Sequence, residues 1–288
     1  SQNNFNRSQN QVMNWTIENT IAYTRSFKDL HSATILLGQG AYVDDNTRAT
    51  NVTYFNLPVD NFDDASMNYA IPTTNINANG GEGQLHKVSS LFARLNYDYD
   101  ERYILTGIIR RDGSSRLGSN NRYGYFPSFS AGWNVTRENF WPQNEVVNFL
   151  KIRGGYGVVG NDNIGNFSYL ATIGGGRNYT IGNLGGYANG FSPNAPPNPD
   201  LKWESTSQAN IGFEATFLQY FSITFDWFNK KTYDILQYPR IPAYIGAISN
   251  PAANVADMQN KGIEIDLGYR RKFGELEFSI NANVSKIK

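Results

Sequence analysis

Two carboxylates, Glu264 and Asp266, have the spacing in this sequence that comes nearest to a catalytic pair. Side chains two residues apart in a β-strand point to the same face, so both carboxylates would face the same way. Glycoside hydrolysis uses two carboxylates, one as acid and the other as base or nucleophile. Large apolar residues occupy the alternate positions Ile263, Ile265 and Leu267, which is typical of an ordinary strand with one polar face. We therefore predict no catalytic residue here.

The two histidines, His31 and His86, both lie where a strand is expected to begin. A catalytic zinc site needs three protein ligands, and the sequence has no cysteine and no third ligand at a suitable spacing. The glycine-rich stretch 174–190 lacks the Lys-Ser/Thr ending of a phosphate-binding loop, so we interpret it as a flexible loop. The sequence thus predicts no metal, no cofactor and no enzyme activity.

Apolar and polar side chains alternate with a period of two in three successive segments near the C-terminal end of the chain. A strand sends successive side chains to opposite faces, so each segment has one apolar and one polar face. A soluble half-buried sheet and a membrane barrel with a water-filled lumen both produce this pattern. The apolar positions are Phe221, Ile223, Phe225, Trp227, Ile263, Ile265, Leu267, Leu276, Phe278 and Ile280.

The composition excludes several classes of protein. The 288 residues carry no net charge and contain no basic block, so no nucleic-acid partner is indicated. Cysteine is absent, which excludes disulfides and thiol catalysis. Mean hydropathy is −0.48, and no run approaches the roughly 18 apolar residues of a membrane-spanning helix. These observations are compatible with a membrane β-barrel, because its alternation cancels in any hydropathy average.

We expect about ten strands, and the lengths of their connections distinguish one fold from another. The connections are alternately short and long, the long ones being 44–85, 160–203 and 235–257, with 113–121 intermediate. Tight turns at one end of the strands and long loops at the other are typical of an outer-membrane barrel. The expected strands are 11–25, 32–43, 86–98, 102–112, 122–136, 149–159, 204–216, 220–234, 258–270 and 275–286.

Aromatic residues flank the short connections. Amphipathic rings gather where hydrocarbon meets the lipid headgroups, so this placement predicts an aromatic girdle on one rim of a barrel. A soluble sandwich or jelly roll gives no reason for aromatic residues to cluster at one end of every hairpin. The residues are Phe27, Tyr97, Tyr99, Tyr103, Phe140, Trp141, Phe217, Tyr220, Phe221, Tyr269 and Phe273.

Five motifs follow one another between residues 110 and 264. They are 110–117 (RRDGSSRL) with 121–133 (NRYGYFPSFSAGW), 150–161 (LKIRGGYGVVGN), 198–205 (NPDLKWES), 226–236 (DWFNKKTYDIL) and 260–264 (NKGIE). In this order they resemble signatures of the SusC/RagA family of TonB-linked outer-membrane proteins. Leu117 stands where phenylalanine is usual in that family, and Val159 where threonine is usual. The resemblance extends from about 86 to 288, while residues 1–85 fit less distinctively.

The resemblance implies an all-β fold, an antiparallel up-and-down transmembrane β-barrel of about 22 strands whose lumen is filled by a plug. Residues 1–288 would then form one partial β-barrel domain with long extracellular loops, without the plug domain and the closing strands. The abrupt start at Ser1 and end at Lys288 also lead us to expect a piece of a longer chain.

The resemblance further implies a transporter of the cell outer membrane in a Bacteroidetes-type Gram-negative bacterium, one that imports glycans or oligopeptides. Its implied partners are outer-membrane lipid, a SusD-like surface lipoprotein that caps the barrel, and TonB, which delivers energy to the plug. The alternatives are a passive outer-membrane porin and a secreted carbohydrate-binding or adhesin β-sandwich. The sandwich predicts that Phe225, Trp227, Ile263 and Ile265 are buried against a second sheet.

Two groups of residues are candidates for contact with a ligand or a plug. Aromatic residues of the long loops, close to Asn and Gly, suit sugar or peptide surfaces; they are Tyr169, Tyr179, Tyr187, Phe191 and Trp203. Polar strand positions would face the lumen and contact the plug; they are Arg94, Asn96, Gln208, Asn210, Glu214, Asp226, Glu264 and Asp266. The apolar positions of the strands would face lipid. We expect Arg110, Arg111, Asp112 and Arg116 to brace a loop by ion pairs.

Overall fold

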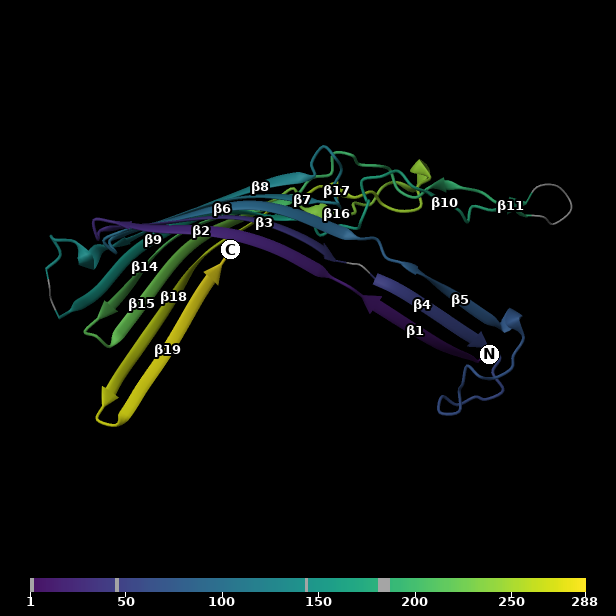
Figure 1. The fold of residues 1–288 in the computed structure, drawn as a ribbon, viewed down its shortest axis with the longest axis horizontal. Helices are drawn as coiled ribbons and strands as arrows, with labels where there is room; N and C mark the ends of the chain where they lie inside the picture. Colours follow the sequence, from purple (N-terminus) through teal and green to yellow (C-terminus); the bar gives the residue numbers. More distant parts are fainter. Residues whose placement is uncertain (1–2, 45–46, 143–144, 181–186) are drawn as a thin grey trace. The chain divides into compact units, whose positions relative to one another are not determined.

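The computed structural model describes residues 3–44, 47–142, 145–180 and 187–288. They fall into two compact units, one formed by the residues up to 17 with 41–88, the other by 18–40 with 89–288. Antiparallel strands dominate both units (Figure 1). No helix among the described residues is long and apolar enough to cross a membrane. That residues 1–288 form one barrel domain stays a prediction.

The ten strands predicted from the sequence all form, and each end lies within four residues of the predicted one. Each strand is rich in alternating β-branched and aromatic residues, which pack well on a pleated surface. They are β2 (Trp15–Phe27), β3 (His31–Asp44), β6 (His86–Tyr99), β7 (Tyr103–Ser114), β8 (Tyr123–Asn134), β9 (Val147–Asn161), β14 (Glu204–Phe217), β15 (Phe221–Tyr233), β18 (Met258–Phe273) and β19 (Leu276–Ile287).

These strands form a single ten-stranded sheet in the order β19-β18-β15-β14-β9-β8-β7-β6-β3-β2 (Figure 1). Among these ten strands, those that follow one another in the sequence are neighbours in the sheet. Strand β14 pairs with β9 and β15, as predicted. Strands β2 and β19 stand at the two ends of the order and do not pair with each other, so the sheet is open. The prediction of a partial, antiparallel up-and-down barrel wall is confirmed.

Three of the short turns share one geometry. In each, two successive residues have φ between 51° and 66°: Lys28 and Asp29, Asp100 and Glu101, and Leu218 with Gln219. In each turn, the N–H of the residue after the pair donates to the carbonyl of the residue before it. In the third turn Tyr220 donates to Phe217 at 3.1 Å, and the distance is 3.2 Å or less in all three. Two successive left-handed residues define a type I′ turn, whose twist matches that of the flanking strands. The turns therefore join neighbouring strands without disturbing their register.

The register gives the sheet two different faces. Phe225 pairs with Ile265, which pairs with Val284, and we call the side that carries these residues the apolar face. Asp226, Glu264 and Ser285 are paired in the same way on the opposite side, the polar face. The predicted apolar positions of β15, β18 and β19 therefore share one face, because cross-strand partners project to the same side.

The apolar face is open to its surroundings. Trp227 is 38% exposed and Ile263 is 37% exposed, so no second sheet of described residues covers them. This differs from the burial that a β-sandwich requires. A large apolar surface left uncovered needs a lipid or protein environment, since soluble monomers rarely expose one of this extent.

Aromatic rings of the apolar face meet at the short-turn end of the strands. Tyr103 stacks on Tyr99 at 6.1 Å between ring centroids and on Trp133 at 6.5 Å, and Trp133 lies 6.5 Å from Phe140. A second group joins Phe221, Tyr269 and Phe278 across β15, β18 and β19. We call these contacts the ring band. It lies where the sequence predicts an aromatic girdle.

One sheet was missed from the sequence. Strands β1 (Asn4–Val12), β4 (Thr47–Phe55) and β5 (Ile76–Glu82) form a three-stranded sheet, whereas 44–85 was expected to be a loop. Polar residues occupy both faces of these strands, so the apolar alternation that identified the other strands is absent. Short ladders also form inside the two other long connections, pairing β10 (Ile173–Gly174) with β13 (Ser192–Pro193), β11 (Tyr179–Thr180) with β12 (Tyr187–Ala188), and β16 (Leu236–Gln237) with β17 (Ala253–Asn254).

We predict opposite sensitivities for two adjacent residues of β18. Ile265→Arg places a charge on the apolar face and should cost about 2–4 kcal/mol if that face contacts hydrocarbon, whereas Asp266→Asn on the polar face should cost little. The measurement is folding of the complete protein into lipid vesicles, followed by its unfolding in denaturant. Equal losses for the two variants would contradict a lipid-facing apolar side.

Candidate functional site

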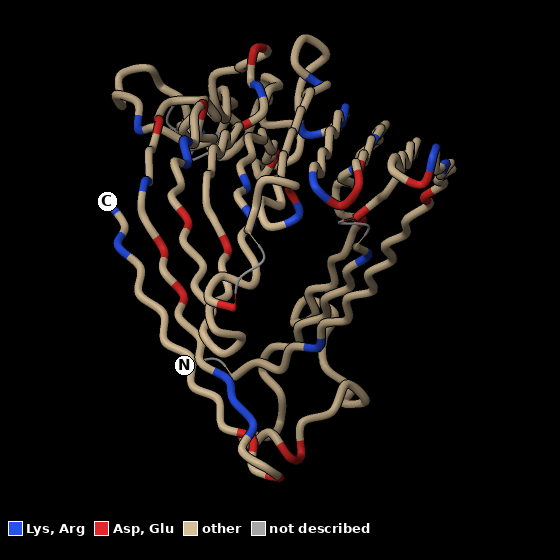
Figure 2. The backbone as a smooth tube through the Cα atoms, turned by 90° about the vertical axis from the view of Figure 1, so that its left-hand side faces the viewer, with Lys and Arg blue, Asp and Glu red and all other residues tan. Residues whose placement is uncertain are grey.

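The polar face carries the polar strand positions singled out in the sequence. Asp226 pairs with Glu264, and Gln208 pairs with Lys230. Asn96 belongs to the same face because it accepts a hydrogen bond from the Thr106 hydroxyl at 3.2 Å. Charged residues lie along the strands near the C-terminal end of the chain and also gather in the connections at the strand ends (Figure 2). Pairing or strand parity places on this face Arg94, Asn96, Gln208, Asn210, Glu214, Asp226, Glu264 and Asp266.

Arg153 connects three strands of the polar face, and the sequence pattern did not reveal it. Its Nε donates to Glu214 Oε1 of β14 at 2.7 Å, and its Nη2 donates to Asp226 Oδ2 of β15 at 2.7 Å. To reach Asp226, Arg153 extends across Gly212, which is its partner on β14. A Cβ at Gly212 would lie 2.3 Å from Asp226 Oδ1, so only glycine leaves room for this contact.

The surroundings of Arg153 carry more negative than positive charge. Asp226 Oδ1 is buried and has no hydrogen-bond partner among the described residues. Glu264 lies opposite Asp226 on β18, and Asp266 follows two residues later on the same face, with both side chains exposed. Exposed carboxylates around a partly neutralised one attract a cationic group. This part of the face is therefore suited to contact a basic segment or a basic ligand.

A shallow hollow lies on the polar face over strands β8, β9, β14 and β15, nearer than Arg153 to the long-loop ends of the strands. Its volume is about 320 Å³. Gly155 and Gly157 form its floor, because glycines leave no side chain between the neighbouring strands. Its lining is mixed: hydroxyl and amide side chains and one lysine lie beside three apolar or aromatic residues. The polar ones are Ser128, Ser130, Thr206, Gln208, Asn210 and Lys230, and the others are Phe129, Tyr156 and Val159. Such a surface offers hydrogen bonds, apolar contact and one positive charge to a peptide or another ligand.

The long loops have a buried core of their own. Leu117, Ile164, Leu201 and Ala252 come from three different connections and form one cluster in which Leu117 and Leu201 are fully buried. Tyr169 and Trp203 pack against this cluster. Trp203 also contacts Phe126 edge to face at 5.4 Å, and its indole N–H donates to the Arg122 carbonyl at 3.2 Å. These two candidates for ligand contact therefore hold the loops together.

Polar contacts fasten the loops to one another and to the strand ends. Arg110 donates to Asp112 at 2.7 Å, and Arg116 donates to Asn166 at 3.1 Å across two loops. Arg111 instead places its guanidinium 3.7 Å from the centroid of the Tyr123 ring. Arg110 thus forms the expected ion pair, but within β7, whereas Arg116 connects two loops and Arg111 makes a cation–π contact.

The remaining loop candidates lie away from this core. Tyr179 is 59% exposed and Phe191 is 70% exposed. Both belong to the part of the loop between β9 and β14 that carries the short strands β10 to β13. Tyr187 belongs to β12, but its side chain lies outside the described residues. Of the aromatic candidates, Tyr169 and Trp203 therefore pack inward, whereas Tyr179 and Phe191 are exposed where a ligand could contact them.

The histidines make ordinary structural contacts. His31 Nδ1 lies 2.7 Å from the Tyr97 hydroxyl, and His86 Nδ1 lies 2.7 Å from Asp44 Oδ1. Both residues begin a strand as expected, His31 in β3 and His86 in β6.

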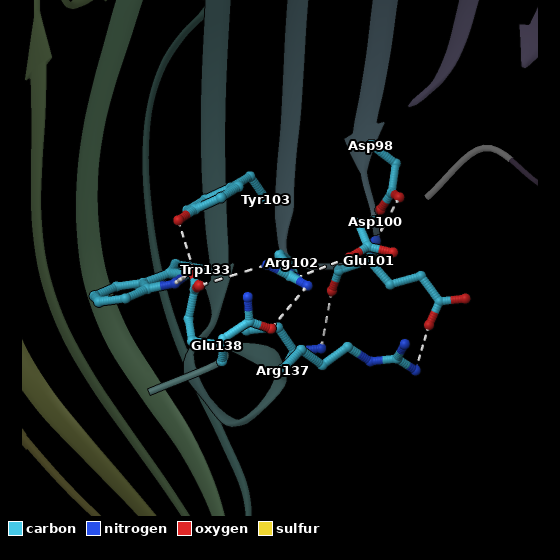
Figure 3. Close-up of polar contacts among 10 residues, drawn as sticks. Asp98, Asp100, Glu101, Arg102, Tyr103, Trp133, Arg137 and Glu138 are labelled. Atoms are coloured by element: carbon cyan, nitrogen blue, oxygen red, sulfur yellow. Dashed lines mark hydrogen bonds and ion pairs between the residues drawn. The ribbon is translucent and has the colours of Figure 1, made fainter. Parts of the chain in front are cut away.

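Glu138, in the connection between β8 and β9, is the centre of a polar cluster at the short-turn end of the sheet (Figure 3). Its Oε1 accepts hydrogen bonds from the Tyr103 hydroxyl at 2.6 Å and from Trp133 Nε1 at 2.9 Å. Arg102 lies 3.8 Å from Oε2, and the Glu138 side chain is only 11% exposed. The hydrogen bond from Tyr103, then that from Trp133, and the charge of Arg102 lower the pKa of Glu138 below its ordinary value.

Comparison with known proteins gives consistent matches. Residues 1–286 match a family model described as TonB dependent receptor-like, beta-barrel. TonB-dependent receptor P39 of Formosa agariphila is 35% identical over 257 residues, which cover 87% of this chain and 23% of that protein. TonB-dependent receptor SusC of Bacteroides thetaiotaomicron is 36% identical over 187 residues, 62% of this chain and 18% of that protein. The chain thus spans about a quarter or less of the length of these relatives.

A solved structure has the same fold. The RagAB peptide importer in its closed-closed state superposes with a TM-score of 0.82 at 24% identity, over 98% of this chain and 30% of that one.

We predict that the polar-face arginine stabilises the sheet. Arg153→Gln leaves Glu214 and Asp226 without their common donor and should lower the free energy of unfolding by about 1–2 kcal/mol, given partial exposure of the group. Lys151→Gln, on the same face of β9, is the matched control and should change it by less than about 0.5 kcal/mol. Denaturant unfolding of the complete protein in detergent measures both. Equal effects would contradict a specific role for Arg153.

The lowered pKa of Glu138 predicts a pH dependence. Its ionised form is the stabilised one, so its contribution is complete above the pKa of an unfolded glutamate, about 4.3, and disappears as pH falls through the lower folded value. Glu138→Gln should therefore lower the unfolding temperature at pH 7, and its effect should become smaller as the pH falls below about 4.3. Glu277→Gln, which removes an exposed partner of Arg270, is the control and should have little effect throughout this pH range. A Glu138→Gln effect that stays the same as the pH falls would refute this assignment.

Proposed function

Because the chain belongs to the family of TonB dependent receptor-like β-barrels, we propose that it forms part of the wall of an outer-membrane transporter that imports glycans or oligopeptides. The resemblance to SusC/RagA proteins found in the sequence motifs is confirmed by the matches to SusC and to RagAB. The family is one of transporters, not of enzymes. The observation that carries the proposal is the continuous apolar face, ringed by aromatic residues at one end, on a sheet with the fold of these barrels.

The proposed location is the outer membrane of a Gram-negative bacterium of the Bacteroidetes type, the group suggested by the Formosa and Bacteroides relatives. The apolar face would contact hydrocarbon, including Phe221, Ile223, Phe225, Trp227, Ile263, Ile265, Leu267, Leu276, Phe278 and Ile280. The ring band would lie at the periplasmic interface, since outer-membrane barrels have their short turns on that side. The long loops would then be extracellular.

The polar face would line the lumen and contact a plug. In barrels of about 22 strands a plug fills the lumen, so polar wall residues need polar partners on its surface. The carboxylates around Arg153 would contact basic plug residues, and the glycine-floored hollow would receive a plug loop or a substrate passing beside it. TonB would supply energy to that plug from the periplasm. In this proposal the wall residues hold the plug through polar contacts, and the channel opens when TonB acts on that plug.

The exposed rings of the extracellular loops are the proposed substrate contacts in this chain. Tyr179 and Phe191 are largely exposed, and aromatic rings pack well on sugar rings and on apolar peptide side chains. A SusD-like surface lipoprotein is the proposed partner above the loops, and RagAB, the structure with the same fold, is described as a peptide importer. Whether the substrate is a glycan or a peptide divides this proposal into two testable forms.

A passive porin is the second candidate, because a barrel with the same wall could conduct without energy. Uptake measurements separate the two mechanisms. Cells that express the complete transporter should take up labelled oligopeptides or oligosaccharides only while TonB is present and the inner membrane is energised. A protonophore or deletion of TonB should abolish uptake. Uptake that continues under either condition would support the porin and contradict the proposal.

We predict that the outer loop rings contribute to affinity for the substrate. Tyr179→Ala and Phe191→Ala should each raise the substrate concentration needed for half-maximal uptake several-fold, since stacking of one ring contributes about 0.5–1.5 kcal/mol. Tyr179→Phe keeps the ring and is the matched control. Trp203→Ala should instead reduce the amount of folded protein, because Trp203 packs on the loop core. Unchanged uptake in both alanine variants would exclude these rings from the binding site.

A further inference from the structure

We propose that a cavity at the short-turn rim binds the headgroup of a membrane phospholipid that carries both a phosphate and a primary ammonium group. The cavity lies between the turn after β6 and the connection after β8, beside Glu138 (Figure 3). Its volume is about 530 Å³, and its lining includes Asp100, Arg102, Arg137, Glu138 and Trp141. Volumes of about 300–1,000 Å³ are typical of small-molecule sites.

The cavity lies at the edge of the apolar face. Tyr103 and Trp133, whose polar atoms donate to Glu138, are cross-strand partners on that face. Their rings belong to the ring band that continues to Tyr99 and Phe140. Tyrosine and tryptophan take this position where hydrocarbon meets headgroups. A phospholipid with its acyl chains along the apolar face would therefore bring its headgroup to the cavity.

The donors of the cavity suit a phosphate. The Arg137 side chain is 53% exposed, and its partner Glu101 is 67% exposed, so their ion pair is readily exchanged for another anion. Guanidinium groups bind phosphate oxygens through two parallel hydrogen bonds. Trp141 Nε1, also at this cavity, is buried and has no hydrogen-bond partner among the described residues. An indole N–H of this kind can donate to a further phosphate oxygen.

The carboxylates of the cavity suit the primary ammonium group of the headgroup. Asp100 and Glu138 balance the charges of Arg102 and Arg137, so the lining has no net charge to favour a purely anionic lipid. Asp100 pairs with Arg102 at 2.9 Å and retains acceptor capacity, because a carboxylate has about four lone-pair sites. A primary ammonium can donate three hydrogen bonds to such acceptors, whereas the trimethylated ammonium of choline can donate none.

The test measures lipid retention by the complete transporter. The protein is purified in detergent, incubated with equal amounts of phosphatidylethanolamine, phosphatidylglycerol and phosphatidylcholine of the same acyl chains, and examined by native mass spectrometry. Phosphatidylethanolamine should be retained about two- to fivefold more than either competitor, the effect expected of a partly exposed charge pair. Equal retention of the three lipids, or a preference for phosphatidylglycerol, would overturn the proposal.

Variants assign the preference to the cavity. Asp100 has φ of 52°, a conformation that asparagine also adopts well, so Asp100→Asn should remove the preference for phosphatidylethanolamine and keep the turn. Asp29→Asn is the matched control, because Asp29 has φ of 53° in the equivalent turn after β2. Arg137→Gln should lower retention of all three lipids, since each has a phosphate. The same loss in Asp29→Asn as in Asp100→Asn would overturn the assignment to this cavity.

The headgroup site rests on the proposed membrane location. One measurement tests the membrane location separately from lipid binding. Folded outer-membrane barrels change their gel migration on heating, so the shift is recorded before lipid is added. A protein that neither shifts nor fractionates with membranes overturns both proposals. A protein that inserts and retains the three lipids equally overturns only the headgroup site.

Discussion

The hydrogen-bond register of the antiparallel sheet is the constraint on which the other features depend. Side chains alternate with a period of two, so a slip of one residue would exchange the positions of Ile265 and Asp266 between the faces. Between β9 and β14 the register shifts only at Thr216 and Phe217, next to the short turn. In hydrocarbon an unpaired backbone group costs several kcal/mol, which gives the register a second reason to be maintained. In three of the short turns, two left-handed residues fix that register where the hairpin begins.

The polar face depends on glycine as much as on charge. Arg153 reaches Asp226 only because Gly212 leaves the space between them, and the hollow exists because Gly155 and Gly157 form its floor. Glycine weakens a strand relative to residues with side chains, so its presence in a continuous sheet needs a reason. Here the reason is close approach, which allows an arginine to cross one strand and leaves the backbone uncovered at the hollow.

The sequence was sufficient to predict the ten strands, because each has one apolar face that appears as alternation. It was not sufficient for β1, β4 and β5, in which Asn6 and Thr53 bond to each other through side chains and both faces are polar. Arg153 and Glu138 were also missed, since their partners lie on other strands and only the register brings them together. Tyr169 and Trp203 could be recognised as important aromatic residues, but their inward packing depends on loops distant in sequence.

Two of the motifs that identify the family include residues that fasten the loops. Leu117 and Leu201, fully buried in the loop core, belong to the first and third motifs, and Trp203 packs beside them. A buried core at the base of the loops restricts the motion of that base, because several packed side chains would have to separate together. Tyr179 and Phe191 lie outside it on an exposed excursion, where substitution changes the contact surface with little effect on the fold. Tyr179 and Phe191 can therefore be replaced at less cost to folding than Leu117 or Leu201, which are fully buried.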